Sequence, residues 1–188
     1  GSVRDALLGR LGNDLDFTTP ARPEVVKEIL DEWAETVWDT GIDFGTVSAA
    51  YKGQQIEITT FRSDSYDGQS RNPEVVYGDT LEGDLVRRDF KANAMAIELL
   101  ADASFKFHDP LHGLQDIADR VLDTPDKPEI SFHDDPLRML RAARFASQLE
   151  FRVADRVVEA MRDMAGEIQR ITVERVQVEL DKLICGTA

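Results

Sequence analysis

The sequence contains a single cysteine, Cys185, and only three histidines among its 188 residues. One cysteine excludes an internal disulfide and a cysteine-rich metal cluster, so a reducing cytoplasm is the expected location. Because no two histidines lie on a predicted helix, a zinc site is not expected either. The sequence also lacks an apolar run near the ~20 residues of a membrane span, and it lacks a charged-then-apolar leader. We therefore predict no membrane association.

Basic residues are scarce as well, with 22 Lys and Arg against 36 Asp and Glu and a net charge of −14. This balance argues against a domain that grips nucleic acid over its whole surface. The arginines nevertheless gather at 87–88 and 138–144, which leaves room for a local basic site. With 42% hydrophobic and 31% charged residues, the composition is that of a folded globular chain.

The pattern of apolar residues and of Gly and Pro predicts an α+β front followed by an all-helical back. The predicted elements are a helix at 3–10, a strand at 14–19, a helix at 21–37 with an apolar stripe that reaches Trp33, strands at 45–53 and 54–62 joined as a hairpin through Gly53, a loop at 63–83, short structured pieces on either side of Asp102, and helices from His133 onward. Composition changes near 126–128, so we predict one domain at 1–126 and a second at 127–188.

Two aspartates, Asp14 and Asp16, alternate with Leu15 and Phe17 in the predicted strand. Aspartate is a poor strand former, so this pattern needs an explanation. Residues two apart project to the same side, roughly 7 Å apart along the backbone. Such a pair can converge on divalent cations, and oxygen ligands favour Mg²⁺ or Mn²⁺. Leu15 and Phe17 are then expected in the core. The alternative is a solvated pair after a Gly-Asn turn.

A third carboxylate, Glu57, lies on another predicted strand. Ile56 and Ile58 share one face of that strand, so Glu57 is expected on the opposite, polar face. If this strand lies beside the first, Glu57 joins the aspartate pair. The alternative is a surface glutamate on a half-exposed sheet.

The chain start offers a candidate anion site. Gly1 and Ser2 precede a helix whose first turn presents unpaired N–H groups, and Arg4 adds positive charge there. Ordinary helix initiation is the alternative.

The opening G-S-V-R-D-A-L-L-G-R followed by D-L-D-F-T-T resembles the start of class II template-independent nucleotidyltransferases, which comprise CCA-adding tRNA nucleotidyltransferases and bacterial poly(A) polymerases. Five later blocks resemble the same family in the same order. These are IEITTFR, DLVRRDFKANAMA, HDPLHGLQDI, DDPLRMLRAARFASQLEF and ITVERVQVELDKL. The resemblance implies a nucleotidyltransferase head at 1–126 that lacks its first strand, a helical neck at 127–188, and a tRNA-gripping part outside this chain.

The same resemblance implies a role for each matched position. It assigns metal binding to Asp14, Asp16 and Glu57, triphosphate binding to Gly1 and Arg4, ribose selection to Asp84 and Arg87 with Arg88, Asp89 and Asn93, base reading to Asp135 and Arg138, and phosphate contact to Arg141 and Arg144. Two Mg²⁺ ions are implied as cofactors, with Mn²⁺ as the alternative. Lys91–Ala94 departs from the family, which usually has a Thr followed by a β-branched residue there.

Helix geometry gives the base-reading block a physical interpretation. Steps of three residues rise about 4.5 Å each, so residues 135, 138, 141 and 144 are predicted to form an oblique ribbon about 13 Å long on one helix. Asp135 can accept from an exocyclic amine, and Arg138 donates in a planar fork. CTP and ATP carry that amine, whereas UTP and GTP have a carbonyl at the same place. The alternative is a helix held by ion pairs worth only ~0.3–0.5 kcal/mol each.

The predicted function is transfer of CMP and AMP from CTP and ATP to a tRNA 3′ end, without a nucleic-acid template and by two-metal catalysis. Two alternatives stay open. One is a poly(A) polymerase of the same family, and the other is a nucleotide-binding module that needs Mg²⁺ but has no turnover.

Overall fold

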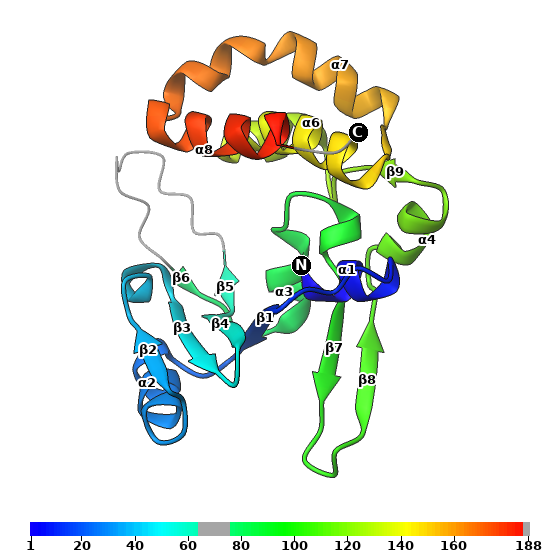
Figure 1. The fold of residues 1–188 in the computed structure, drawn as a ribbon. Coiled ribbons are helices and arrows are strands. Elements are labelled where there is room, and N and C mark those ends of the chain that lie inside the picture. The colour runs from blue at the N-terminus through cyan, green and yellow to red at the C-terminus, as the bar shows by residue number, and fades with distance from the viewer. Residues whose placement is uncertain (64–75, 186–188) are drawn as a thin grey trace. The chain divides into compact units, whose positions relative to one another are not determined.

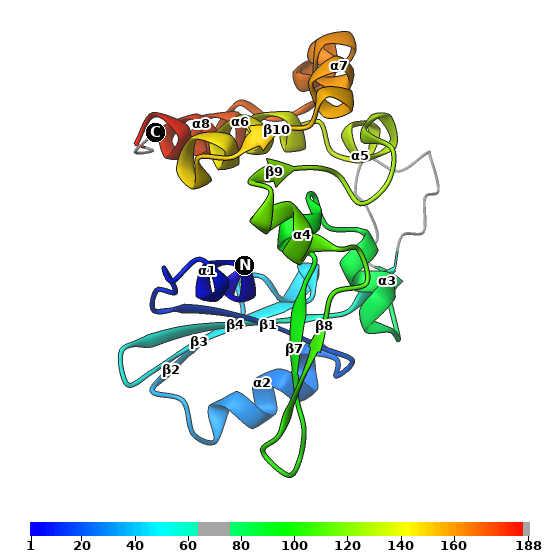
Figure 2. The same cartoon turned by 90° about the vertical axis from the view of Figure 1, so that its right-hand side faces the viewer.

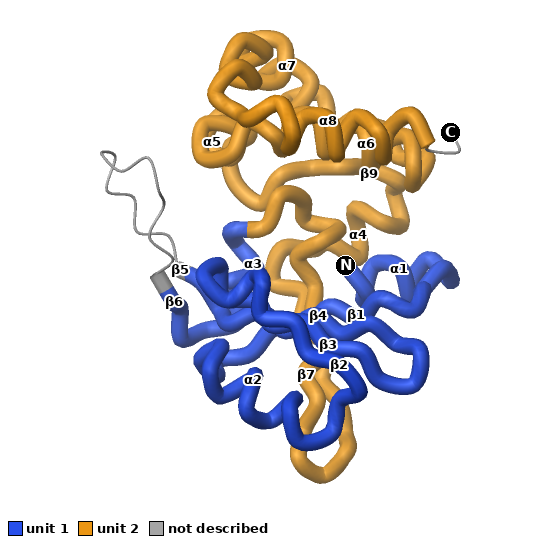
Figure 3. The backbone as a smooth tube through the Cα atoms, turned by 60° about the vertical axis from the view of Figure 1, so that its left-hand side comes forward, with its two compact units in different colours: residues 1–87 blue, residues 88–188 orange. Residues whose placement is uncertain are grey.

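The computed structural model describes residues 1–63 and 76–185. The chain divides into two compact units, residues 1–87 and residues 88–188 (Figure 3). The predicted domain boundary at 126–127 therefore lies within the second unit.

The first unit is built on one mixed sheet (Figure 1). Its elements are α1 (Ser2–Leu7), β1 (Asp14–Thr19), α2 (Pro23–Asp31), β2 (Thr36–Trp38), η1 (Ile42–Phe44), β3 (Thr46–Tyr51), β4 (Gln54–Thr60), β5 (Arg62–Ser63), β6 (Val76–Tyr77) and α3 (Leu81–Val86). The sheet order is β1-β4-β3-β2, and β1 runs parallel to β4 whereas the other pairs are antiparallel. The predicted mixed sheet with flanking helices is confirmed.

Helix α2 packs against the apolar face of this sheet. Val26 and Leu30 from the helix and Val47 and Ala49 from β3 form the buried cluster. The helix ends at Asp31, six residues earlier than predicted, and its chain continues into β2. Only part of the predicted apolar stripe is therefore used, and Trp33, beyond the helix end, is 44% exposed.

A two-residue turn joins β3 to β4. Lys52 and Gly53 both have positive φ, at 48° and 76°, as a type I′ turn requires. Tyr51 pairs directly with Gln54, so the turn fixes the register of the whole hairpin. This hairpin matches the prediction, including its connection through Gly53.

Residues 64–75 of the predicted 63–83 loop lie outside the described residues. The described remainder departs from a loop, because β6 and the start of α3 fall within it. Thr80 caps α3 by accepting a hydrogen bond from Gly83 N at 3.2 Å.

The second unit is mainly helical. Its elements are η2 (Lys91–Asn93), β7 (Ala96–Leu99), β8 (Phe105–His108), α4 (Gly113–Ala118), β9 (Val121–Leu122), α5 (Pro128–Asp134), α6 (Leu137–Leu149), β10 (Arg152–Val153), α7 (Asp155–Asp163), η3 (Ala165–Arg170) and α8 (Val173–Ile184). Phe132, Met139, Val157 and Ala160 form one buried cluster within it. The pieces predicted around Asp102 are the antiparallel strands β7 and β8.

Two features of this unit differ from the prediction. The helical part begins at Pro128 rather than His133, because proline suits the first turn of α5. A short strand, β10, also interrupts the helices and pairs in parallel with β9. Among the described residues, no helix is long and apolar enough to cross a membrane.

Gly113 allows α4 to approach η2 closely. A Cβ atom at this position would lie 2.2 Å from the Lys91 carbonyl oxygen and 3.1 Å from Met95 Cγ. Replacing Gly113 with Ala must therefore shift backbone, and we expect the free energy of unfolding to fall by about 2–3 kcal/mol. Urea denaturation would measure this loss. Gly166→Ala is the control, since nothing lies within 4 Å of a Cβ there. Equal stability of Gly113→Ala and the unchanged protein would contradict the close approach.

Asp116 in α4 gives the protein a pH-dependent stability. Burial of this carboxyl raises its pKa to about 6 against the opposing charge of Lys91, and the charges of Asp123, Asp119 and Asp109 add to the rise. Within the described part of the chain, Asp116 Oδ2 is buried without a hydrogen-bond partner. A pKa higher in the folded than in the unfolded state stabilises the fold at low pH. That contribution is lost as the pH rises through about 6.

Replacing Asp116 with Asn should remove this loss. At pH 7.5 we expect the free energy of unfolding of the variant to exceed that of the original protein by less than about 1 kcal/mol. The gain is small because the Asp116 side chain is partly exposed and solvent screens its charge. Near pH 4 the two proteins should be equally stable. Thermal unfolding from pH 4 to pH 8 tests this, with Asp163→Asn as the exposed control. A difference that does not vary with pH would refute the assignment.

Candidate active site

The start of α1 is fastened to β1 between the two aspartates. Ser2 Oγ accepts a hydrogen bond from Asp16 N at 2.8 Å and lies 3.3 Å from the Asp14 carbonyl oxygen, to which it donates. The first turn of α1 is thereby held beside the predicted metal ligands. No contact of the Ser2 hydroxyl was predicted from the sequence. A hydroxyl residue at a helix start is the only sequence signal for such a contact, and it usually indicates a local cap.

The register of β1 and β4 places the three predicted metal ligands on one face of the sheet. Asp16 pairs with Glu57 across the parallel ladder, and Asp14 is two residues earlier on the same strand. Alternation along each strand puts Ile56 and Ile58 on the other face, with α2. Figure 2 shows α1 and α2 on opposite sides of this sheet. The predicted polar face of β4 is confirmed.

One expectation about β1 is wrong. Leu15 is half-buried, but Phe17, which we expected in the core, is 40% exposed. Strand β1 is one of the two edge strands of the sheet. Its apolar face is consequently covered less than the faces of β3 and β4.

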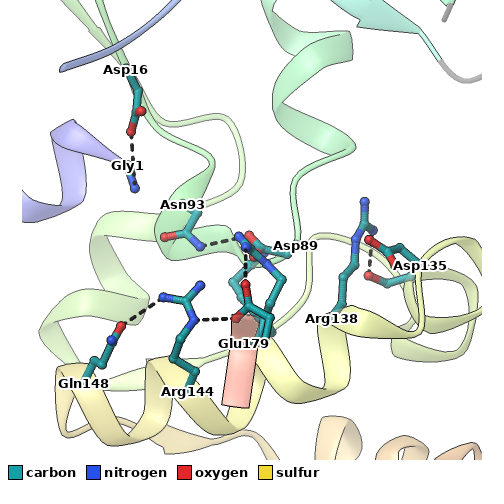
Figure 4. Close-up of polar contacts among 12 residues, drawn as sticks. Gly1, Asp16, Asp89, Asn93, Asp135, Arg138, Arg144, Gln148 and Glu179 are labelled. Carbon is teal, nitrogen blue, oxygen red and sulfur yellow. Dashed lines mark hydrogen bonds and ion pairs between the residues drawn. The ribbon is translucent and has the colours of Figure 1, made fainter. Parts of the chain in front are cut away.

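The three carboxylates share a face without forming a closed cluster. In residues 1–63 and 76–185, no three His, Cys, Asp or Glu side chains are grouped as a metal site. The Asp16 side chain is 50% exposed, and its Oδ2 lies 3.9 Å from the Gly1 nitrogen (Figure 4). Asp16 is thus accessible to a ligand at the beginning of α1.

Arg4 is a buried part of α1 rather than an exposed cation. Arg4 is 7% exposed, and its Nε and one terminal nitrogen each donate to an Asp5 carboxylate oxygen at 2.8 Å. This paired, two-point contact fixes the plane of the guanidinium group. The predicted contact with a triphosphate stays a prediction.

The predicted ribose-selecting block is divided between the two units. Asp84 lies in α3 of the first unit, where it is 5% exposed and accepts from Arg62 N at 3.3 Å. Arg87 is the last residue of that unit, and Arg88 is the first of the next. Asn93 follows in η2.

Asp89 is the centre of a buried network in the second unit. Its Oδ2 accepts from Arg141 Nε at 2.8 Å, and its Oδ1 accepts from Asn93 Nδ2 and Phe90 N, each at 2.9 Å. Burial alone would raise the pKa of Asp89. The charge of Arg141, hydrogen bonds from Asn93 and Arg141 and the charge of Arg138 outweigh burial and hold that pKa below its usual value. Asp89 therefore stays ionised and orients Asn93 and Arg141.

Glu179 of α8 continues this network (Figure 4). It is 4% exposed, its Oε2 accepts from Arg144 Nε at 2.6 Å, and its Oε1 lies 3.6 Å from Arg141. Arg144 also donates to Gln148 Oε1 at 2.9 Å. The charges of Arg141 and Arg144 are thus balanced by Asp89 and Glu179. Sequence reasoning missed Glu179, because one glutamate among the charged residues of a helix gives no signal of burial.

The predicted base-reading pair lies where α5 meets α6, and its geometry differs from the predicted one. Asp135 does not belong to the helix, because its φ and ψ are −143° and 99° and α6 begins only at Leu137. The ribbon predicted on one helix is therefore wrong at its first member, and only residues 138, 141 and 144 follow the helical steps. Proline at 136 explains the break, because it disfavours a helical conformation of the preceding residue.

Asp135 and Arg138 are nevertheless neighbours in this turn. Arg138 N donates to the Asp135 carbonyl oxygen at 3.0 Å, and Figure 4 shows the two side chains next to each other. The Arg138 guanidinium donates to Ser131 Oγ at 2.9 Å. Asp135 Oδ1 accepts from Leu137 N at 3.2 Å. An acceptor and a planar donor therefore lie side by side at the start of α6.

Curated relatives match this chain from end to end. A CCA-adding enzyme of Lactobacillus helveticus is 41% identical over 187 residues, which are 99% of this chain and 45% of the relative. A CCA-adding enzyme of Listeria monocytogenes is 41% identical over 189 residues, or 100% of this chain and 46% of the relative. The chain thus spans slightly less than half the length of these relatives.

Solved structures show the same fold. The Bacillus stearothermophilus CCA-adding enzyme in complex with CTP has a TM-score of 0.85 at 38% identity, over 99% of this chain and 43% of that one. A tRNA nucleotidyltransferase complexed with a primer tRNA and an incoming ATP analogue has a TM-score of 0.79 at 30% identity, over 96% and 50% of the two chains.

Family models give the most direct assignment. A model described as "Probable RNA and SrmB- binding site of polymerase A" matches residues 150–188. A model described as "Poly A polymerase head domain" matches residues 1–123, well over half of the chain. The resemblance seen in the sequence is thereby confirmed, and the chain belongs to the poly(A) polymerase head-domain family of nucleotidyltransferases.

Proposed function

We propose that the protein containing this chain is a CCA-adding tRNA nucleotidyltransferase, which transfers CMP and AMP from CTP and ATP to a tRNA 3′ end. The observation that carries the proposal is the alignment of Asp14, Asp16 and Glu57 on one sheet face. Identity of 41% to CCA-adding enzymes along the whole chain supports it. We further propose that residues 1–126 are the catalytic head and residues 127–188 the neck, and that the protein works in the cytoplasm.

We propose Mg²⁺ as the cofactor, with Mn²⁺ as the alternative. The donor set fits, because Mg²⁺ in phosphate-handling sites is commonly held by one or two carboxylates, with water and substrate phosphates as its other ligands. A closed protein cluster is not needed for this. Asp14 and Asp16 would hold the ions with help from Glu57. When bound, Mg²⁺ lowers the pKa of the attacking hydroxyl and neutralises charge on the triphosphate.

The remaining site residues divide into four proposed roles. Gly1 and Arg4 would meet the triphosphate beside the carboxylates. Asp84, Arg87, Arg88 and Asn93 would select the ribose, and Asp135 with Arg138 would read the base. Phosphate contact by Arg141 and Arg144 stays a prediction, and each arginine would have to share its charge with Asp89 or Glu179.

Incubation of the full-length protein with a tRNA that lacks its terminus, Mg²⁺ and each NTP tests this function. We expect addition of C, C and A and then arrest. Long A tails would instead indicate the alternative function, a poly(A) polymerase of the same family. Mg²⁺-dependent binding of CTP without incorporation would indicate the binding module and would refute catalysis.

A further inference from the structure

Two arginines from the C-terminal part of the chain hold the turn between α5 and α6. Arg170 at the end of η3 donates to the His133 carbonyl oxygen at 3.1 Å. Arg175 in α8 donates to Asp135 Oδ2 at 2.9 Å. The segment that carries Asp135 is therefore fixed both through its backbone and through its carboxylate.

The contacts of Asp135 fix the direction of its carboxylate. Oδ1 accepts from Leu137 N at 3.2 Å, and Oδ2 accepts from Arg175. A carboxylate oxygen has two lone pairs, so each oxygen keeps one acceptor position after these bonds. The carboxylate can thus receive a further donor but is hindered from turning about its own axis. Without Arg175, the weaker contact to Leu137 N would be the remaining hydrogen bond to this carboxylate among the described residues.

Stability alone does not account for the contact between Arg175 and Asp135. Their side chains are 52% and 30% exposed. Ion pairs at such exposure contribute about 0.2–1 kcal/mol to folding. Glu179 lies four residues after Arg175 on the same helix face, and it binds the arginines of α6. One face of α8 therefore supports both Asp135 and α6.

We propose that Arg175 is a positioning residue that sets nucleotide selectivity by aiming the Asp135 carboxylate at the amine of an incoming CTP or ATP. This inference rests on the proposed function. A carboxylate free to rotate would accept from the amine less often, and its repulsion of the carbonyl in UTP would also weaken. Loss of Arg175 should consequently affect the choice between nucleotides more than the rate of transfer itself.

The test compares Arg175→Ala and Arg175→Lys in the full-length protein. The ratio of kcat/KM for CTP to kcat/KM for UTP is measured on a tRNA that lacks its terminus. We expect this ratio to fall about tenfold in Arg175→Ala, mostly through a higher KM for CTP, because small misplacements of a recognition group are costly. Lysine should restore part of the ratio, since it can donate to Oδ2 but not in a planar fork.

Two further variants serve as the negative and positive controls for the ratio. Lys182→Ala removes an exposed cation from the same helix and should leave the ratio unchanged. Arg138→Ala removes the proposed donor and should lower the ratio at least as much as Arg175→Ala. The thermal unfolding midpoint of every variant should stay within about 2 °C of that of the original protein. A change in the ratio then reports selectivity rather than loss of fold.

The outcomes separate this inference from the proposed function. If the original protein incorporates neither C nor A, the proposed function fails. If it prefers CTP and Arg175→Ala keeps the same preference, the function stands and the inference is overturned. An equal loss of kcat/KM for CTP and UTP would also overturn it, because a purely structural role predicts that pattern. If Arg175→Ala does not fold, the ratio in Arg175→Lys decides, and an unchanged ratio together with an unchanged KM refutes the inference.

Discussion

Replacing Asp16 with Asn is expected to lower nucleotide incorporation by the full-length protein at least about a thousandfold. Asparagine keeps the shape of the side chain but removes the charge that a divalent cation requires. Asp16 pairs with Glu57 across the β1–β4 ladder, so it is the member of the aspartate pair that lies directly beside the third proposed ligand. Its side chain is half-exposed, and stability should change by less than about 0.5 kcal/mol. Primer extension and thermal unfolding measure the two effects.

Asp43→Asn is the matched control, because it removes one exposed carboxylate from the same unit. It should leave incorporation unchanged. Asp14→Ala combined with Asp16→Ala should abolish incorporation and also Mn²⁺ binding, measured by titration calorimetry. Incorporation at the original rate by the double variant would rule out these residues as the metal site. Loss of incorporation with unchanged Mn²⁺ binding would assign them a different role.

Replacing Glu179 with Ala is expected to reduce the free energy of unfolding by about 3–5 kcal/mol. The change leaves the guanidinium groups of Arg141 and Arg144 without their shared carboxylate in a largely buried setting. Glu179→Gln keeps one acceptor without the charge, so its loss should be smaller, about 1–3 kcal/mol. Urea denaturation measures both, and far-UV circular dichroism reports whether α6 and α8 persist.

Glu174→Ala is the control for this series, since it removes an exposed glutamate from the first turn of the same helix. Its stability should lie within about 0.5 kcal/mol of the original protein. Equal losses in Glu174→Ala and Glu179→Ala would mean that helix propensity, and not the buried ion pairs, accounts for the effect.

Local sequence patterns predicted the sheet that carries the carboxylates. Alternation along 14–19 and 54–60 assigned Asp14, Asp16 and Glu57 to polar faces, and Gly53 marked the turn. These features depend on strand periodicity and turn chemistry, which are determined by residues close together in the sequence. Strand order is not local. The sequence predicted that Glu57 joins the aspartate pair only if the two strands are neighbours. The structure shows that β1 and β4 are neighbours.

The helices of the second unit show what the sequence alone could not provide. Helical spacing identified the helices, but periodicity continued through Pro136 and placed Asp135 on α6. The proline itself was the available warning. The partners of Arg141 and Arg144 were beyond reach, because Asp89 and Glu179 are 52 and 35 residues distant from the arginines that they bind. Ion pairs between such distant segments leave no spacing pattern.

The two-residue turn at Lys52–Gly53 has a consequence for how this chain tolerates insertions and deletions. Strand side chains alternate between faces, so one added residue that slipped β4 by a single position would exchange its two faces. Glu57 would then point at α2, and an isoleucine would stand beside Asp16. The number of residues in that turn is therefore itself a requirement for assembling the three carboxylates, although neither turn residue contacts them.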